Sequence, residues 1–149
     1  MVQEFIHVRE VEQSDLLTVY QIARNSFKDP YPLKLLRHIY KTNSEGFLVA
    51  EINDEVVGYL IGVVRWGSVG HVLAIAVKEP YRRRRVGSSL MINAFSRFRE
   101  QGAKKVELEA RVSNEGAQDF YKRLGFESKE IVPAYYSDGE AAVSMEHEL

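Results

Sequence analysis

A run of four arginines at residues 82–85 constrains this chain most, because it lies between an apolar segment and a helical pattern. Residues 71–77 are rich in small and β-branched side chains, which predicts a buried strand. Beyond the run, apolar residues recur at helical spacing: Val86, Leu90, Met91, Ala94, Phe95 and Phe98. The first N–H groups of a helix lack partners within the helix and, together with the helix dipole, attract anions. The sequence therefore predicts a strand, a basic turn and a helix that bind a phosphorylated ligand.

The composition is that of one soluble globular domain. The chain has 149 residues, of which 45% are hydrophobic and 28% charged, so we expect a single domain over residues 1–149. The formal net charge is −1, so the arginine run is a local feature. This balance argues against non-specific nucleic-acid binding, and we expect no nucleic-acid partner.

Several kinds of chemistry are excluded by residue usage. The chain has no cysteine, hence no disulfide, thiolate metal site or cysteine nucleophile. His7, His38, His71 and His147 show no metal-ligand spacing, so no metal is expected. No apolar run is long enough to span a bilayer, and residues 1–4 do not resemble a signal peptide. We expect a cytoplasmic protein without a membrane partner.

The order of predicted elements is strand, two helices, three strands, helix, strand, helix and two strands. Residues 5–8 form the first strand, Ser14 caps the first helix, and residues 53–55 join a hairpin. Asn114 caps the last helix. This order predicts an α/β (α+β) fold with one mixed, mostly antiparallel, seven-stranded sheet and about four helices. The central strand–helix–strand crossover requires one parallel pair.

Three segments together resemble a known family: residues 82–87 (RRRRVG), residues 108–114 (LEARVSN) and residues 135–141 (YYSDGEA). Along nearly its whole length the chain resembles the GNAT superfamily of acetyl-CoA-dependent N-acetyltransferases. Within that superfamily it is most similar to the bacterial and archaeal protein N-terminal acetyltransferases of the ribosomal-protein alanine type. The resemblance implies the GNAT fold, with acetyl-CoA as co-substrate. Arg85 stands where the family usually has glycine. Arginine keeps the backbone N–H but restricts the backbone, and we expect cofactor binding to survive.

On sequence alone the arginine run is either a solvated turn or a phosphate site. Cations at a helix start oppose its dipole unless an anion is present, which favours the phosphate site. The resemblance adds a backbone edge that pairs with the pantetheine arm, and a hydrogen bond from the Asn114 side chain. The predicted cofactor-binding residues are Ile75, Ala76, Val77, Arg82, Arg83, Arg84, Arg85, Val86, Gly87, Ser88, Asn114 and Tyr121.

Two residues are predicted to be catalytic by the resemblance, although the pattern alone gives them ordinary roles. Glu109 alternates with Glu107 and Arg111 in a row that would face solvent, and Tyr121 would be a core aromatic residue. The resemblance implies that Glu109 accepts a proton from the amine and that Tyr121 protonates the departing CoA thiolate. His71 is predicted to lie at a strand end rather than to act as a base.

The acceptor site is predicted from aromatic and proline residues in two loops, which would otherwise be plain loop anchors: Phe27, Pro30, Tyr31, Tyr135 and Tyr136. The resemblance implies direct transfer of an acetyl group to a primary amine, most simply the α-amine of a protein N-terminus. Lysine side chains or a small amine are the alternative acceptors, and an acyl-CoA-sensing or nucleic-acid-binding module without catalysis is a further alternative. We expect acetyl-CoA and a peptide as partners, in a monomer or homodimer.

Overall fold

The computed structural model describes residues 5–149, so the prediction about a signal peptide at residues 1–4 lies outside the described residues. The strands follow the hydrogen-bonded order β1-β2-β3-β4-β5-β7-β6, which confirms the predicted seven-stranded mixed sheet. Two compact units make up the chain. The first extends to Val63 and includes Ala74–Arg97, and the second comprises Val64–Leu73 and Phe98–Leu149. Within residues 5–149, no helix combines the length and apolar character needed to cross a bilayer.

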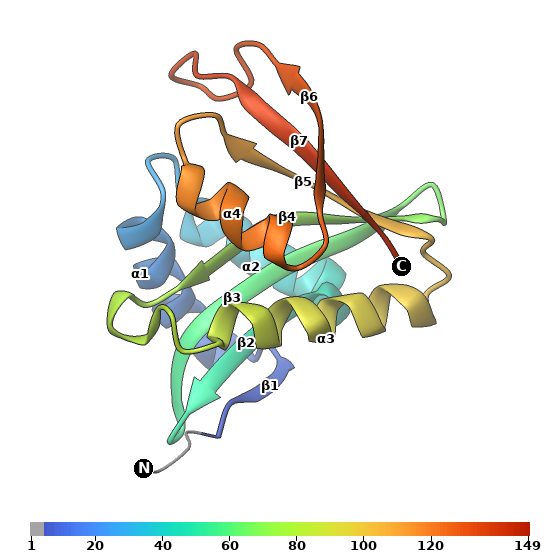
Figure 1. Ribbon diagram of the computed structural model, residues 1–149. Helices are drawn as coiled ribbons and strands as arrows, with labels where there is room; N and C mark the ends of the chain where they lie inside the picture. Colours follow the sequence, from blue (N-terminus) through green and yellow to red (C-terminus); the bar gives the residue numbers. More distant parts are fainter. Residues whose placement is uncertain (1–4) are drawn as a thin grey trace. The chain divides into compact units, whose positions relative to one another are not determined.

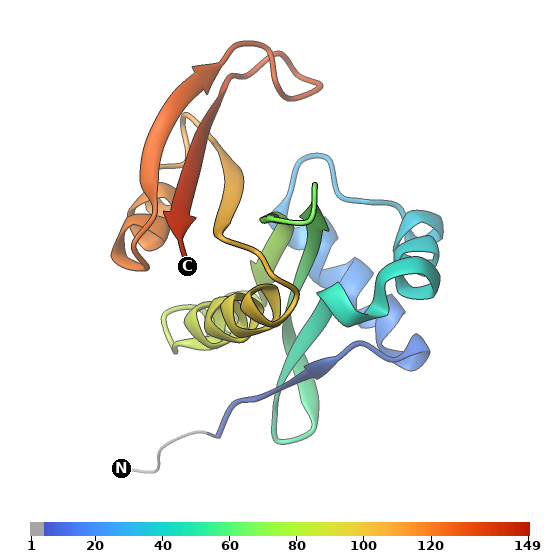
Figure 2. The same cartoon turned by 90° about the vertical axis from the view of Figure 1, so that its right-hand side faces the viewer.

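The first unit is a set of antiparallel strands with helices on both faces. Its elements are β1 (His7–Glu10), α1 (Leu16–Ser26), α2 (Leu33–Asn43), β2 (Phe47–Ile52), β3 (Glu55–Arg65) and most of α3 (Val86–Glu100). Figures 1 and 2 show α3 on one face of β2 and β3, with α1 and α2 on the other. Continuous apolar runs in β2 and β3 fit this burial on both faces, and Phe47, Leu48 and Ile61 are almost fully buried.

A glycine in β3 brings the start of α3 close to the strands. An added Cβ at Gly58 would lie 3.1 Å from Val86 Cγ1 and 3.1 Å from the Ala76 carbonyl oxygen. Such distances are tighter than ordinary van der Waals contact, so a larger residue would push the helix start away. The position of the basic turn therefore depends on a residue without a side chain, 24 residues or more before it.

The second unit joins a strand pair to a helix and a hairpin. Its elements are the first part of β4 (Val69–Val77), β5 (Lys105–Arg111), α4 (Glu115–Arg123), β6 (Glu127–Val132) and β7 (Ala142–Glu148). β4 and β5 are parallel, with Val69 opposite Lys105 and His71 opposite Glu107. This confirms the predicted parallel crossover pair. β7 pairs antiparallel with both β5 and β6, as Figure 1 shows.

Most predicted boundaries are confirmed, but two at the N-terminal side are wrong. Asn114 caps α4, its Oδ1 accepting from the Ala117 N–H at 3.1 Å, and the hairpin between β2 and β3 is confirmed. Ser14 is not a helix cap, because residues Gln13–Asp15 form a 3₁₀ turn and α1 begins at Leu16. The Asp15 carboxylate fixes this turn, since it accepts from the Glu12 N–H at 2.7 Å and from Arg9 at 2.8 Å. β1 begins at His7 rather than at residue 5.

The turn from α4 into β6 requires glycine at residue 125. Gly125 has φ +102°, and an added Cβ would lie 2.9 Å from Cε1 and from Nδ1 of His147. His147 Nδ1 also donates to the Gly125 carbonyl at 3.1 Å. We expect Gly125→Ala to lower the free energy of unfolding by more than the about 1–2 kcal/mol that left-handed backbone alone costs a non-glycine residue. Urea denaturation of the variant and the wild type measures this loss.

Gly67→Ala is the matched control, because Gly67 has φ +71° but no atom within 4 Å of an added Cβ. It should lose only the backbone contribution. Equal losses in the two variants would contradict the steric role of His147.

Candidate active site

The basic turn leads directly into α3. Arg82 to Arg85 are all exposed, and the helix begins at Val86. The Ser89 N–H donates to the Arg85 carbonyl at 3.0 Å, so Arg85 occupies the N-cap position. The N–H groups of Val86, Gly87 and Ser88 belong to the first helical turn, whose donors cannot bond within the helix. The turn thus has the backbone donors and the cationic side chains that an anion requires.

Two arginines in this turn adopt left-handed backbone. Arg83 has φ +64° and Arg85 has φ +67°, a region that costs an ordinary residue about 1–2 kcal/mol. Glycine would adopt this conformation without strain, which fits the glycine that the family resemblance implies at residue 85. Arg85 adopts the same left-handed region and carries a positive charge.

Arg82 binds the end of β4 through a hydrogen bond to its last residue. Its Nε donates to the Val77 carbonyl at 2.8 Å, and its Nη2 donates to Ser26 Oγ at 3.3 Å. Arg84 lies over the ring of Tyr81, 5.3 Å from its centroid. A short 3₁₀ turn, Glu79–Tyr81, precedes the arginines and was not predicted from the sequence. Although the four arginines are adjacent and identical in the sequence, their side chains therefore have different surroundings.

Residues 75–77, at the end of β4, are the segment predicted to bind the pantetheine arm, and they lie partly in the core and partly at the surface. Ala76 is buried, while Ile75 and Val77 are only partly covered. Beyond them, the Lys78 N–H donates to the Val57 carbonyl at 2.7 Å. These three residues belong to the first unit, together with the arginine turn.

In the second unit, the Glu109 carboxylate accepts hydrogen bonds from two other segments. Its Oε1 lies 2.7 Å from His71 Nε2 on β4, and the Tyr135 hydroxyl donates to the same oxygen at 3.2 Å. The side chains of His71 and Glu109 are only 9% and 18% exposed. Burial alone would raise the pKa of Glu109, but the hydrogen bonds from His71 and Tyr135 and the charge of Arg65 hold it below its ordinary value. Glu109 is therefore ionised at neutral pH.

The tautomer of His71 follows from its surroundings. Its Nδ1 is buried and has no hydrogen-bond partner among the described residues, so we assign the proton to Nε2, which donates to Glu109. This pairing was not predicted from the sequence. The signal was the predicted parallel pair, because His71 and Glu109 lie on strands that become adjacent only through the crossover.

Tyr121 lies on α4 among other aromatic rings. Its ring centroid is 5.4 Å from that of Phe120 and 5.8 Å from that of Phe126, and only 9% of the residue is exposed. Burial raises the pKa of the Tyr121 phenol, as does the neighbouring Tyr136. The phenol therefore stays neutral at any physiological pH and can donate a hydrogen bond.

The predicted acceptor residues fall into two groups. Tyr135 and Tyr136 lie in the second unit, where their rings pack edge to face at 5.0 Å and Tyr135 reaches Glu109. Phe27, Pro30 and Tyr31 lie in the first unit, in the connection between α1 and α2, where Phe27 is exposed and the other two are partly covered. The structure thus brings Tyr135 and Tyr136 together with Glu109.

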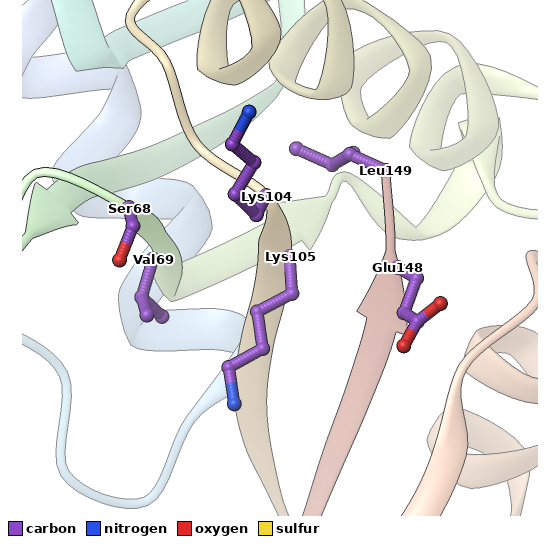
Figure 3. A pocket seen from close by; sticks show the side chains of 6 residues that line it. All are labelled: Ser68, Val69, Lys104, Lys105, Glu148 and Leu149. Carbon is purple, nitrogen blue, oxygen red and sulfur yellow. The ribbon is translucent and has the colours of Figure 1, made fainter.

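A pocket of about 350 Å³ lies at the beginning of the β4–β5 pair. Figure 3 shows its lining residues: Ser68, Val69, Lys104, Lys105, Glu148 and Leu149. No predicted site residue lines it.

Comparison with known proteins identifies the class. Residues 16–126 match the acetyltransferase (GNAT) family, and the chain belongs to this family. It is 35% identical to an N-alpha-acetyltransferase of Sulfurisphaera tokodaii, over 93% of this chain and 90% of the relative. Among solved structures it is similar to Ard1 from Thermoplasma volcanium, with a TM-score of 0.92, 35% identity and 97% of each chain covered. The ribosomal-protein-S18-alanine N-acetyltransferase from Escherichia coli has a TM-score of 0.83 and 25% identity, over 97% of this chain and 94% of that one.

Restoring glycine at residue 85 should relieve strain in the arginine turn. We expect Arg85→Gly to raise the free energy of unfolding by about 0.5–1 kcal/mol, because relief of the left-handed backbone exceeds the added entropy of the unfolded chain. Thermal denaturation without ligand measures the change. Arg84→Gly, at a residue without positive φ, is the control and should lose stability. A less stable Arg85→Gly variant would contradict this account.

Proposed function

We propose that this protein transfers the acetyl group of acetyl-CoA to the N-terminal α-amine of a protein. Membership of the GNAT family and the similarity to N-alpha-acetyltransferases support acetyl transfer to an N-terminus. The observation that carries the proposal is the Glu109 carboxylate, ionised and half-buried, with donors from His71 and Tyr135 beside it.

The basicity of Glu109 suits an α-amine better than a lysine side chain. An N-terminal α-amine has a pKa of about 7.7–8.0, against about 10.4 for lysine, so a useful fraction of it is already neutral at pH 7. A carboxylate whose pKa is lowered is a weak base, and it can assist the loss of the amine's second proton only as the new C–N bond forms. Lysine would require a stronger base or an additional one.

The reaction proceeds by direct attack, since the chain has no cysteine that could carry the acetyl group. The amine nitrogen bonds to the thioester carbonyl carbon while Glu109 accepts its proton. A backbone N–H near residues 75–77 stabilises the oxyanion. The C–S bond then breaks and the thiolate leaves.

Tyr121 acts on the leaving sulfur chiefly as a hydrogen-bond donor. A thiol has a pKa of about 8.5 and an unperturbed phenol about 10, so full transfer of the phenol proton to the thiolate is unfavourable. Burial raises the phenol pKa further and widens this gap. A hydrogen bond from neutral Tyr121 lowers the energy of the thiolate without such a transfer. The thiolate takes up a proton from water after the C–S bond breaks, and Glu109 releases the amine's proton to water, which restores the carboxylate.

For acetyl-CoA, we propose that the backbone N–H groups of Gly87 and Ser88 bind the diphosphate, with charge from Arg83 and Arg85. Arg82 positions the strand end instead, given its bond to the Val77 carbonyl. The remaining cofactor contacts, at residues 75–77, Asn114 and Tyr121, follow the family resemblance. The single domain, the cytoplasmic location and the monomer or homodimer stay predictions.

Peptides with free and blocked N-termini test the function. We expect mass spectrometry to find one acetyl group on the α-amine of free peptides and none on acetyl-blocked peptides that contain lysine. Acetylation of the blocked peptides alone would contradict the N-terminal assignment and favour lysine acceptors. Binding of coenzyme A without any turnover would favour the sensing module.

Replacing Glu109 tests its role as proton acceptor. We expect Glu109→Gln to lower kcat by about 10²-fold at pH 7, with KM for acetyl-CoA unchanged, because general-base assistance is lost. Steady-state kinetics on a free-amine peptide measure this. In the wild type, kcat/KM should rise with pH up to about 8 as the α-amine loses its proton.

Glu107→Gln is the matched control, two residues earlier on the same face of β5, where Glu107 pairs with Lys105 at 3.3 Å. This variant should keep the wild-type kcat. A kcat equally reduced in both variants, or reduced in neither, would remove Glu109 from the mechanism.

A further inference from the structure

One cationic side chain, Arg111, contacts three residues of the connection between β6 and β7: Tyr136, Asp138 and Glu140. Its Nη1 lies 2.9 Å from Asp138 Oδ2 and 2.8 Å from Glu140 Oε1. Its guanidinium also stacks on Tyr136, 4.1 Å from the ring centroid. The side chains of Arg111, Asp138 and Glu140 are 16%, 39% and 21% exposed, so solvent screens the pair with Asp138 more than the pair with Glu140. We call residues 133–141 the acceptor loop.

The acceptor loop is folded around these contacts. The Gly139 N–H donates to the Tyr136 carbonyl at 2.9 Å, and the Tyr136 N–H donates to the Glu140 carbonyl at 3.1 Å. The Glu140 N–H donates to Asp138 Oδ1 at 3.0 Å. Both carboxylates thus lie on the same side as Arg111. Without that cation, two negative charges would face each other across a tight turn.

The same cluster reaches the beginning of α4. Glu140 Oε2 accepts hydrogen bonds from both the backbone N–H and the hydroxyl of Ser113, which precedes the cap residue Asn114. These bonds, together with Arg111, lower the pKa of Glu140 from 4.5 to about 2. The acceptor loop is therefore tied at one end to β5 and at the other to the turn that starts the helix carrying Tyr121.

Arg111 stands two residues after Glu109, so both side chains extend from the same face of β5. Arg111 fixes Tyr136, Tyr136 packs against Tyr135, and the Tyr135 hydroxyl donates to Glu109. Three successive contacts within the second unit therefore connect Arg111 and its ion pairs to Glu109, the proposed base. Arg111 has no role in accepting or donating the reacting proton.

We propose that Arg111 is a positioning residue that holds the acceptor loop, with Tyr135 and Tyr136, in place beside Glu109, and so sets the affinity for the acceptor peptide. The proposal rests on the proposed function, because the acceptor is taken to be a protein N-terminus. Its consequence is a separation of effects: loss of Arg111 weakens acceptor binding and leaves acetyl-CoA binding intact.

Two independent measurements on the whole 149-residue chain test the role of Arg111. In Arg111→Gln, hydrogen–deuterium exchange of residues 133–141 should rise without any ligand, because the loop loses its ion pairs and its ring contact. KM for a free-amine peptide should rise about tenfold, as when a partly buried charge pair is broken, with KM for acetyl-CoA unchanged. Arg111→Lys should recover part of both effects, since lysine keeps the charge but lacks the planar group that stacks on Tyr136.

Lys105→Gln is the matched control, a cation on the same face of β5 that pairs with Glu107 at 3.3 Å and Glu146 at 3.5 Å. It should change neither exchange in the loop nor peptide KM. If Arg111→Gln does not fold, Asp138→Asn removes one partner and should give a smaller rise in both quantities.

Unchanged exchange of residues 133–141 would overturn the positioning role. Raised exchange with unchanged peptide KM would also overturn it, because Arg111 would then stabilise the fold only. Wild-type protein that acetylates no α-amine would instead defeat the proposed function and the acceptor assignment, while the exchange measurement would still decide whether Arg111 holds the loop.

Discussion

In the second unit, the Glu109 carboxylate is largely withdrawn from water, so its charge must be balanced by neighbouring groups. Removing Glu109 from water disfavours its ionised form, and donors from β4 and from the acceptor loop offset that cost. The arrangement fixes three things together: the protonation state of Glu109, the tautomer of His71 and the position of Tyr135. The Glu109 carboxylate is therefore ionised at neutral pH and held in one position by its two donors.

In the first unit, by contrast, a cluster of positive charges lies at the surface. Four exposed arginines crowd a helix start, where cations are unfavourable, and two of them adopt strained backbone. Such strain persists where surrounding contacts impose it, and it is typical of functional turns. A bound diphosphate would offset the repulsion.

Local patterns predicted most of the fold. The apolar spacing of α3, the Asn114 cap and the parallel crossover pair are confirmed, because each depends on neighbouring residues or on chain order. Contacts between distant residues could not be predicted in this way. The pairing of His71 with Glu109 requires the register of two strands that are 38 residues apart in the sequence. The different contacts of the four arginines likewise depend on what surrounds each guanidinium group. Four consecutive arginines in the sequence give no information about those surroundings.

The titration of the Glu109 carboxyl group tests the central claim most directly. In protein labelled with ¹³C at the glutamate carboxyl carbon, the Glu109 resonance is assigned by its absence from Glu109→Gln and followed from pH 2 to 8. We expect a pKa below the ordinary glutamate value of 4.5, rising when His71 is replaced by leucine, which cannot donate, because the donated hydrogen bond favours the ionised form. A Glu109 pKa above 4.5 in the wild type, or one unaffected by His71→Leu, would contradict the account.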